Sequence, residues 1–424
     1  MVVKSVSVNP LKTSPAIGAS YALHGIENAL SLFHAAPGCT FLGKVLLTQV
    51  TKEPVGVVGT DIKEIATIMD GGELLEEKIL SHYKKFKPSL IGVIATALSE
   101  VRGEDIESSV RSLINKNSTE NTELLYINTP DYIGGFSEGY AKTVETIIDK
   151  LVEPSIDEIA DQINIIPSGS MTIAEIDEIK ELVSAFGLKS IVLPDISRSI
   201  DGSKNHYSNL PFDGTTMDDI KCFSKSAATI VIGESMSKVT RLLSDKLDMP
   251  LFPIEIPVGL SASDHLITIL MDISGNQPTE IIKRWRNRLI DAMADTHLLM
   301  ADKEISLGLE KDDIMGLIPF INELGIKLRV AIASTSSSKK FEIDSSIGIK
   351  VGDLEDLEIL GSDSDLLISN SHAKEASKRL GIPLLRMGFP ITDSFGEQYR
   401  SRIGYKGSLQ FLFEIARYFN GTIK

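Results

Sequence analysis

The strongest constraint on the fold is an alternation that runs along almost the whole chain. Short runs of aliphatic and β-branched residues end in small or turn residues, and longer segments with a helical period separate them. Such runs predict buried parallel strands, and the segments between them predict crossover helices. We therefore expect an α/β fold of mainly parallel sheets flanked by helices.

The same alternation predicts individual elements. Strands are expected at residues 89–96, 123–130, 163–169, 190–195, 228–235, near 251, and at 327–334, 348–352, 365–369 and 383–387. Helices are expected at residues 100–115, 137–152, 312–324, 373–380 and 408–419.

The chain is too long for a single hydrophobic core. Its 424 residues correspond to two to four domains, at about 100 to 200 residues each. We expect three Rossmann-like modules: an N-terminal α/β module at residues 1–152, a second at 153–275, and a third at 276–424 that includes a helical connector and a C-terminal helix. Residues 261–299, which carry Trp285 and no strand-like run, are interpreted as the connector.

Charge and hydropathy exclude several classes of partner. The net charge is −15, so the average field of the protein repels a phosphate backbone or an anionic membrane surface. The first residues show no secretory signal pattern, and nowhere do about 18 apolar residues run together. We expect a cytoplasmic protein that binds neither nucleic acid nor membrane.

Only two cysteines occur, Cys39 and Cys222. Two thiols are too few for a disulfide framework, and no CxxC or Cys/His cluster accompanies them. The chain therefore cannot enclose a zinc ion or a cubane cluster by itself. Any four-cysteine cluster must take ligands from another chain.

Cys39 lies in the segment LFHAAPGCTFLGK. Pro37 and Gly38 predict a turn that presents Cys39 at the opening of a helix, where the helix dipole stabilises the thiolate that binds iron. A free cysteine is also one of the most commonly buried residues, so a small packed hydrophobe is the alternative. His34, five residues earlier, could donate a hydrogen bond behind the site, although a packed histidine is the simpler interpretation.

Other candidate residues have simpler structural explanations. Cys222 lies on an expected helix without a neighbouring glycine or proline, which favours a buried structural thiol. His372 follows a strand, but helix capping by Asn370 and Ser371 explains that segment. In the acidic run at 352–358, Asp353 is expected to cap a helix, and the charges fall on different helix faces.

The chain shows no motif of a self-contained catalytic site. It has no GxGxxG, no GxxxxGK[ST] and no GxSxG sequence, and no paired carboxylates or Cys/His pair of recognisable spacing. We expect neither ATP binding nor a catalytic residue.

A series of segments in fixed order resembles the nitrogenase component 1 β-subunit superfamily, and within it the NifN group of iron-molybdenum cofactor assembly. Members typically read HG-x-x-GC around the first cysteine, whereas here Ala35 replaces the first glycine. The resemblance implies three Rossmann-like modules of the nitrogenase component 1 type. The matching segments are residues 9–44, 51–72, 128–148, 185–202, 214–220, 232–236, 284–297, 351–358, 366–391 and 403–416.

The resemblance also assigns a role to Cys39. Nitrogenase β subunits use three cysteines for the P-cluster, and the second and third positions fall at about Val57 and Ala97, which cannot ligate iron. The NifN group instead contributes one cysteine to a 4Fe-4S cluster shared with a NifE-type α-like subunit in an α2β2 heterotetramer. Cys39 is thus implied as the metal-binding and cofactor-binding residue.

In this group the complex receives a cofactor precursor from a NifB-type donor and matures it with the nitrogenase iron protein, a NifH-type reductase. The iron-molybdenum cofactor precursor is held mainly by the partner, so the resemblance implies a scaffold subunit. Two alternatives stay open. One is a β-like subunit of a nitrogenase-related reductase that acts on a tetrapyrrole, an organosulfur compound or another substrate. The other is a clusterless interaction subunit in which Cys39 is merely buried.

Overall fold

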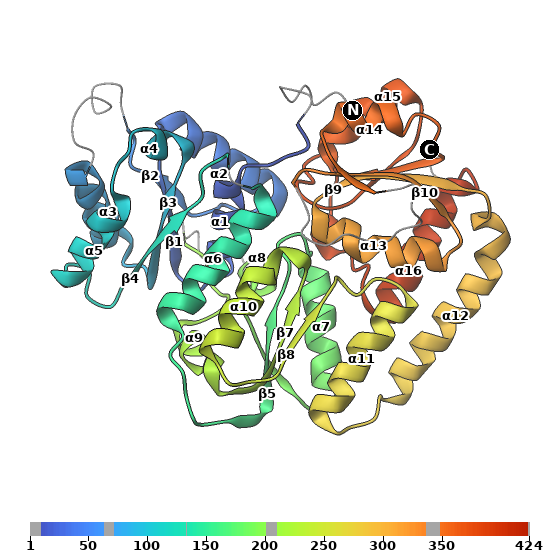
Figure 1. Cartoon of the computed structure of the whole chain (residues 1–424), viewed down its shortest axis with the longest axis horizontal. Helices are drawn as coiled ribbons and strands as arrows, with labels where there is room; N and C mark the ends of the chain where they lie inside the picture. Colours follow the sequence, from blue (N-terminus) through green and yellow to red (C-terminus); the bar gives the residue numbers. More distant parts are fainter. Residues whose placement is uncertain (1–9, 63–71, 133, 201–209, 336–347, 423–424) are drawn as a thin grey trace.

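The computed structural model describes residues 10–62, 72–132, 134–200, 210–335 and 348–422. Parts of the segments that carry the resemblance, at residues 9, 63–71, 133 and 201–202, lie outside this description. The described chain forms three α/β units arranged around a common centre (Figure 1). Within these ranges, no helix is long and apolar enough to cross a membrane.

The first unit is a four-stranded parallel sheet in the order β2-β1-β3-β4. Helix α6 runs beside α1 at the inner side of this sheet, toward the other two units (Figure 1). The expected helix at 100–115 is broken at Gly103, where φ is positive, and Asp105 caps its second half. The elements are α1 (Pro15–His24), β1 (Ala29–His34), α2 (Pro37–Thr51), β2 (Val57–Gly59), α3 (Gly72–Phe86), β3 (Leu90–Ala95), α4 (Ala97–Val101), α5 (Ile106–Asn115), β4 (Glu123–Asn128) and α6 (Phe136–Leu151).

The second unit is also a four-stranded parallel sheet, in the order β6-β5-β7-β8. Its strands match the expected ones. The elements are β5 (Ile159–Ile166), α7 (Ile173–Ala185), β6 (Lys189–Val192), α8 (Ile196–Ile200), α9 (Met217–Cys222), η1 (Phe223–Lys225), β7 (Ser226–Ile232), η2 (Glu234–Met236), α10 (Ser237–Lys246) and β8 (Leu251–Ile254).

The third unit has five parallel strands in the order β11-β10-β9-β12-β13. The expected connector is a pair of helices, α11 (Leu260–Ser274) and α12 (Glu280–Met300), and α12 packs along the C-terminal helix. The other elements are β9 (Glu304–Leu309), α13 (Lys311–Glu323), β10 (Lys327–Ala333), β11 (Ile349–Val351), α14 (Leu354–Leu360), β12 (Leu366–Ser369), η3 (Ser371–Ala373), α15 (Lys374–Leu380), β13 (Leu384–Arg386), η4 (Glu397–Tyr399) and α16 (Gly404–Phe419).

Three strands were not expected from the sequence. They are β1 and β2 in the first sheet and β9 in the third. The α/β class with mainly parallel sheets is confirmed. The residue boundaries that we expect between the modules stay a prediction.

Helices α1 and α6 pack with their backbones in contact. Gly18 and Gly139 lie at this contact, and a Cβ atom on either would overlap a backbone carbonyl oxygen of the other helix, that of Phe136 or Pro15 respectively. Nearby, the ring of Phe136 stacks on Phe389 from the third unit, with centroids 3.9 Å apart. Close backbone packing thus holds α1 against α6, and the aromatic contact joins the first unit to the third.

Candidate functional site

Cys39 lies on the first turn of α2, beyond the carboxyl end of β1. The backbone N–H of Cys39 donates to the carbonyl of Ala36 at 3.1 Å, and Pro37 occupies the start of the helix, where its missing N–H leaves nothing unsatisfied. The Cys39 side chain is exposed. The alternative of a small packed hydrophobe is therefore wrong for this residue, and the expected position at a helix opening is confirmed.

The helix that carries Cys39 is apolar and mostly uncovered. Lys44 is its only charged residue, and only four of its fifteen residues are buried. Phe41 and Leu42, beside Cys39, are 66% and 67% exposed. Large apolar side chains that are exposed next to each other are unusual on a surface that faces water.

The uncovered surface of α2 continues to the third unit. Phe41, Val45, Thr48 and Lys52 follow one another at helical spacing, and all are exposed or half-buried. The ammonium of Lys52 lies 5.4 Å from the centre of the Phe395 ring and donates to a carbonyl of the same loop at 3.3 Å. Phe395 is 91% exposed.

The two positions where nitrogenase β subunits carry further cysteines contribute no ligand here. Val57 is buried in β2, and Ala97 opens α4 after β3. Strands β2, β1 and β3 are neighbours in the sheet, so the segments that follow them meet at one edge. Within the described residues, no group of three or more His, Cys, Asp and Glu side chains is placed to hold a metal ion.

His34 is fully buried at the end of β1, beneath the turn that carries Cys39. Its Nδ1 lies 3.0 Å from Thr60 Oγ1, and its Nε2 is hydrogen-bonded to the carboxylate of Glu104. Glu104 pairs in turn with Arg102 at 2.6 Å. Burial lowers the pKa of His34, which favours the neutral ring. His34 is buried, as the packed interpretation expects, but it also has polar partners, which could not be predicted from the sequence. Its alternative role as a hydrogen-bond donor behind the site stays a prediction.

The remaining candidates behave as structural residues. Cys222 ends α9 and packs, half-buried, against the main core. Asn370 accepts a hydrogen bond from the backbone of His372, and Asp353 caps α14 by accepting from the backbones of Glu355 and Asp356. These interactions confirm the caps formed by Asn370 and Asp353, whereas the Ser371 hydroxyl donates to Asp393 instead of capping the helix.

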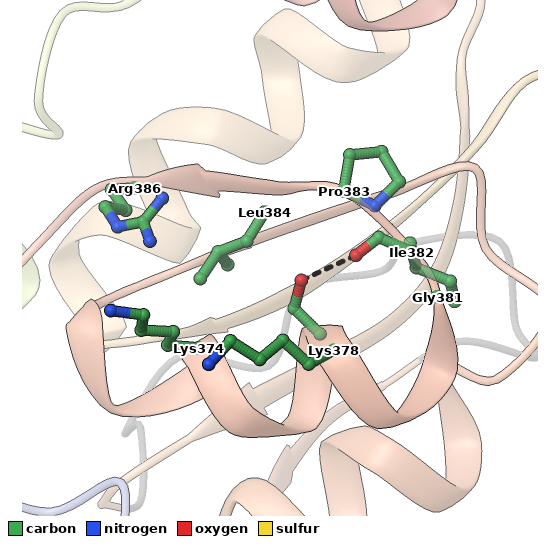
Figure 2. A pocket seen from close by; sticks show the side chains of 8 residues that line it. Lys374, Lys378, Gly381, Ile382, Pro383, Leu384 and Arg386 are labelled. Atoms are coloured by element: carbon green, nitrogen blue, oxygen red, sulfur yellow. Dashed lines mark hydrogen bonds between the residues drawn. The ribbon is translucent and has the colours of Figure 1, made fainter. Parts of the chain in front are cut away.

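A basic pocket of about 540 Å³ lies between α15 and β13 (Figure 2). Figure 2 shows the side chains of Lys374 and Lys378 along the helix, facing the strand that carries Arg386. Each cation has a carboxylate partner: Lys374 and Arg386 contact Asp393 at 3.5 and 2.9 Å, and Lys378 contacts Glu375 at 2.8 Å. The hydrogen bonds of Arg386 hold the pKa of Asp393 well below its usual range. The positive charge of this pocket is therefore largely compensated.

Sequence reasoning missed a cluster of buried acids at the start of α13. The carboxylate of Asp312 accepts from the Ser168 and Ser235 hydroxyls at 2.6 and 2.5 Å, and from the Ser235 backbone at 2.8 Å. Burial raises the pKa of Asp312, and raises the pKa of Asp313 well above its usual value. Paired acids at the start of a helix usually indicate an exposed first turn, so no sequence signal distinguishes this buried case.

A small cavity of about 20 Å³ lies near this cluster, where the second and third units meet α1. Ser170, Gly388 and Arg402 are among the residues that line it. This volume holds about one water molecule. No large cofactor fits within it.

Comparisons with known proteins agree with these features. The family described as nitrogenase component 1 type oxidoreductase matches residues 14–420. The chain is 36% identical to the nitrogenase iron-molybdenum cofactor biosynthesis protein NifN of Mesorhizobium japonicum, over 99% of this chain and 92% of that protein. It is 37% identical to NifN of a Nostoc species, over 98% of this chain and 94% of that protein.

Nitrogenase proteins are also similar. The molybdenum-iron protein beta chain of Clostridium pasteurianum is 32% identical, over 97% of this chain and 93% of that chain. The solved structure of nitrogenase Cp1 at pH 6.5 superposes with a TM-score of 0.92 at 31% identity, covering 100% of this chain and 95% of that one. The likeness extends over the three units.

Proposed function

Because the chain belongs to the nitrogenase component 1 type oxidoreductase family, and NifN proteins match nearly its full length, we propose that it is a β-like scaffold subunit. On this scaffold the precursor of the nitrogenase iron-molybdenum cofactor is matured. In this proposal Cys39 provides one ligand to a 4Fe-4S cluster, and a NifE-type α-like subunit provides the other three.

The observation that carries the ligand assignment is the exposure of Cys39, beside which the described residues form no group of His, Cys, Asp and Glu that could hold a metal ion alone. A cubane cluster held by cysteines needs four thiolates. This chain has two cysteines, and Cys222 packs against the core on another unit. The residues present therefore fit one ligand of a cluster completed by a second chain.

The surface around Cys39 supports a permanent partner. The side chains of Phe41 and Leu42 are exposed to water on α2. Burying each of them against a partner stabilises a complex by roughly 1.5–3 kcal/mol. Obligate partners commonly cover such patches. An α-like subunit that covers α2 would exclude water from the cluster as well as complete its ligands. When bound, the cluster supplies one-electron transfer at the interface.

The precursor itself is proposed to reside mainly in the partner. Among the residues that the structure describes, the cavity at the junction of the second and third units measures about 20 Å³, far too small for an iron-sulfur cofactor. The proposal also includes a NifB-type donor of the precursor and a NifH-type reductase that docks on the complex. We propose the assembly to be an α2β2 heterotetramer.

The test replaces each cysteine in turn in the anaerobically co-purified complex. We expect Cys39→Ala to retain the partner but lose the electron paramagnetic resonance (EPR) signal of the small reduced cluster, together with its iron and sulfide. Cys222→Ala is the matched control and should keep the signal. A signal that persists unchanged in Cys39→Ala would refute the ligand assignment. A complex of the unaltered chain without acid-labile sulfide would support a clusterless interaction subunit instead.

A further inference from the structure

A chain of buried polar side chains ties together the three loops at the edge of the first sheet. His34 ends β1, Thr60 follows β2, and Arg102 and Glu104 follow β3 and α4. His34 contacts both other loops, through Nδ1 to Thr60 at 3.0 Å and through Nε2 to Glu104. His34 is 0% exposed, and the side chains of Arg102 and Glu104 are each 10% exposed. Such a buried network holds its members in one arrangement.

The contacts of His34 determine which of its two ring nitrogens carries the hydrogen. A neutral imidazole has one N–H, and the Glu104 carboxylate, paired with Arg102, accepts hydrogen bonds. Nε2 of His34 therefore carries the hydrogen and donates it to Glu104. Nδ1 is left as the acceptor of the Thr60 hydroxyl hydrogen. Both ring nitrogens are satisfied in a single tautomer, so the ring cannot turn over without breaking both bonds.

The loop that carries Cys39 rests on the same segments. The N–H of Ile62 donates to the carbonyl of Ala35 at 3.1 Å, and the N–H of Thr60 donates to the carbonyl of Phe33 at 3.0 Å. The side chain of Thr40 lies against Gly59, where a Cβ atom would come within 2.5 Å of the Thr40 hydroxyl oxygen. The first turn of α2 thus packs against the end of β2. The hydrogen bond between His34 and Thr60 holds the residue that follows β2 in place.

We propose that His34 is a positioning residue for Cys39: held between Thr60 and Glu104, it locks the loops after β1, β2 and β3 so that the thiol projects in one orientation toward the cluster. The proposal rests on the function proposed above for its cluster, but the locking of the loops is a property of this chain alone. The proposal predicts that replacing His34 changes the mobility of these loops and the environment of the cluster, but not partner binding. Replacing a histidine that merely fills space would change neither the loops nor the cluster.

The structure offers a matched control. His24 is also a neutral histidine buried in the first unit; burial lowers its pKa to about 4, and its Nε2 has no hydrogen-bond partner among the described residues. Replacing either ring by leucine removes a buried imidazole. Only His34→Leu removes the ties between the loops.

The first experiment measures amide hydrogen exchange in the isolated chain. We expect His34→Leu to speed exchange at Cys39, Thr40, Thr60 and Ile62 by about tenfold, the effect of losing roughly 1.4 kcal/mol of local stability. His34→Gln, whose side-chain amide can still donate to Glu104, should restore most of the protection. His24→Leu should leave these amides unchanged. If His34→Leu does not fold, Glu104→Gln, which keeps the shape and removes the charge, is expected to speed the same amides.

The second experiment records the EPR spectrum and reduction potential of the small cluster in the complex. His34→Leu should alter the line shape and shift the potential while partner stoichiometry stays the same, and His34→Gln should recover the original spectrum. Unchanged exchange and an unchanged spectrum in His34→Leu, or in Glu104→Gln if that variant is used, would overturn the proposal. If the unaltered complex lacks the cluster, the proposed function fails, and the exchange experiment alone decides the role of His34.

Discussion

The Ser137 hydroxyl donates a 2.8 Å hydrogen bond to the Glu310 carboxylate and so joins α6 of the first unit to the start of α13 in the third. The other carboxylate oxygen of Glu310 accepts from Ser334 at 3.0 Å. Burial is the main cause that raises the pKa of Glu310 from its ordinary 4.5 to about 7; the charges of Glu138 and Asp312 also raise it, and the hydrogen bonds from Ser137 and Ser334 lower it. The contact between units therefore contains an acid that titrates near neutral pH.

This shift predicts that stability falls as pH rises from about 4.5 to about 7. In that window the unfolded chain ionises at position 310 while the folded chain keeps its proton, and above it both are ionised. Glu310→Gln removes this dependence. The quantity to compare is the free energy of unfolding of the variant minus that of the unaltered protein. We expect this difference to be larger at pH 8 than at pH 5 by on the order of 3 kcal/mol. Urea-unfolding curves at the two pH values measure the difference, and an equal effect at both would contradict the assignment.

Alanine at Gly139 should separate α1 from α6. The added methyl group would overlap the carbonyl oxygen of Pro15, which is backbone and cannot move aside alone. We expect a loss of about 3 kcal/mol, at the upper end of overpacking effects. Gly348→Ala is the control, because a Cβ atom there meets nothing within 4 Å. Equal unfolding midpoints for the two variants would argue against close packing of the helices.

Leu42→Glu should weaken the proposed complex. A carboxylate on the uncovered face of α2 would have to be buried without a partner, which typically lowers affinity by several kcal/mol. Ile114→Glu provides a control on α5 of the same unit, where the side chain is 51% exposed. Dissociation constants of the two variants for the α-like subunit give the comparison. Tight binding by Leu42→Glu would mean that the partner does not cover this helix.

The two thiols should react at different rates in the isolated chain. Cys39 is exposed, whereas Cys222 is half-buried against the core. With a thiol reagent we expect one fast and one slow reaction per chain, and the fast one should disappear in Cys39→Ser. Adding the α-like subunit should protect Cys39, even in preparations without iron. If Cys39 keeps its fast rate in the complex, the cysteine lies outside the interface.

Much of the fold followed from the alternation of strands and helices, and the missed strands have physical reasons. β2 has only three residues, and β1 follows the apolar helix α1 so closely that no change of period separates them. β9 reads EISLGL, with serine and glycine in place of β-branched residues, yet it is the central strand of its sheet. Such a strand is defined by neighbours distant in the sequence.

The candidate site was predictable only in part. The turn of Pro37 and Gly38 identified the helix that presents Cys39, because proline favours the first position of a helix. The partners of His34 could not be foreseen, since Thr60 and Glu104 are 26 and 70 residues away. Contacts between loops at a sheet edge depend on strand order, which residue patterns alone do not determine.

The bare helix α2 has a consequence for how such a chain is produced. A chain that is synthesised without a partner subunit exposes this hydrophobic surface. Other unassembled chains and chaperones bind to such surfaces. Surplus synthesis of this polypeptide would then yield aggregate or degraded product instead of a stored pool. Under the proposed function, this chain and its α-like subunit would need to be synthesised in matched amounts.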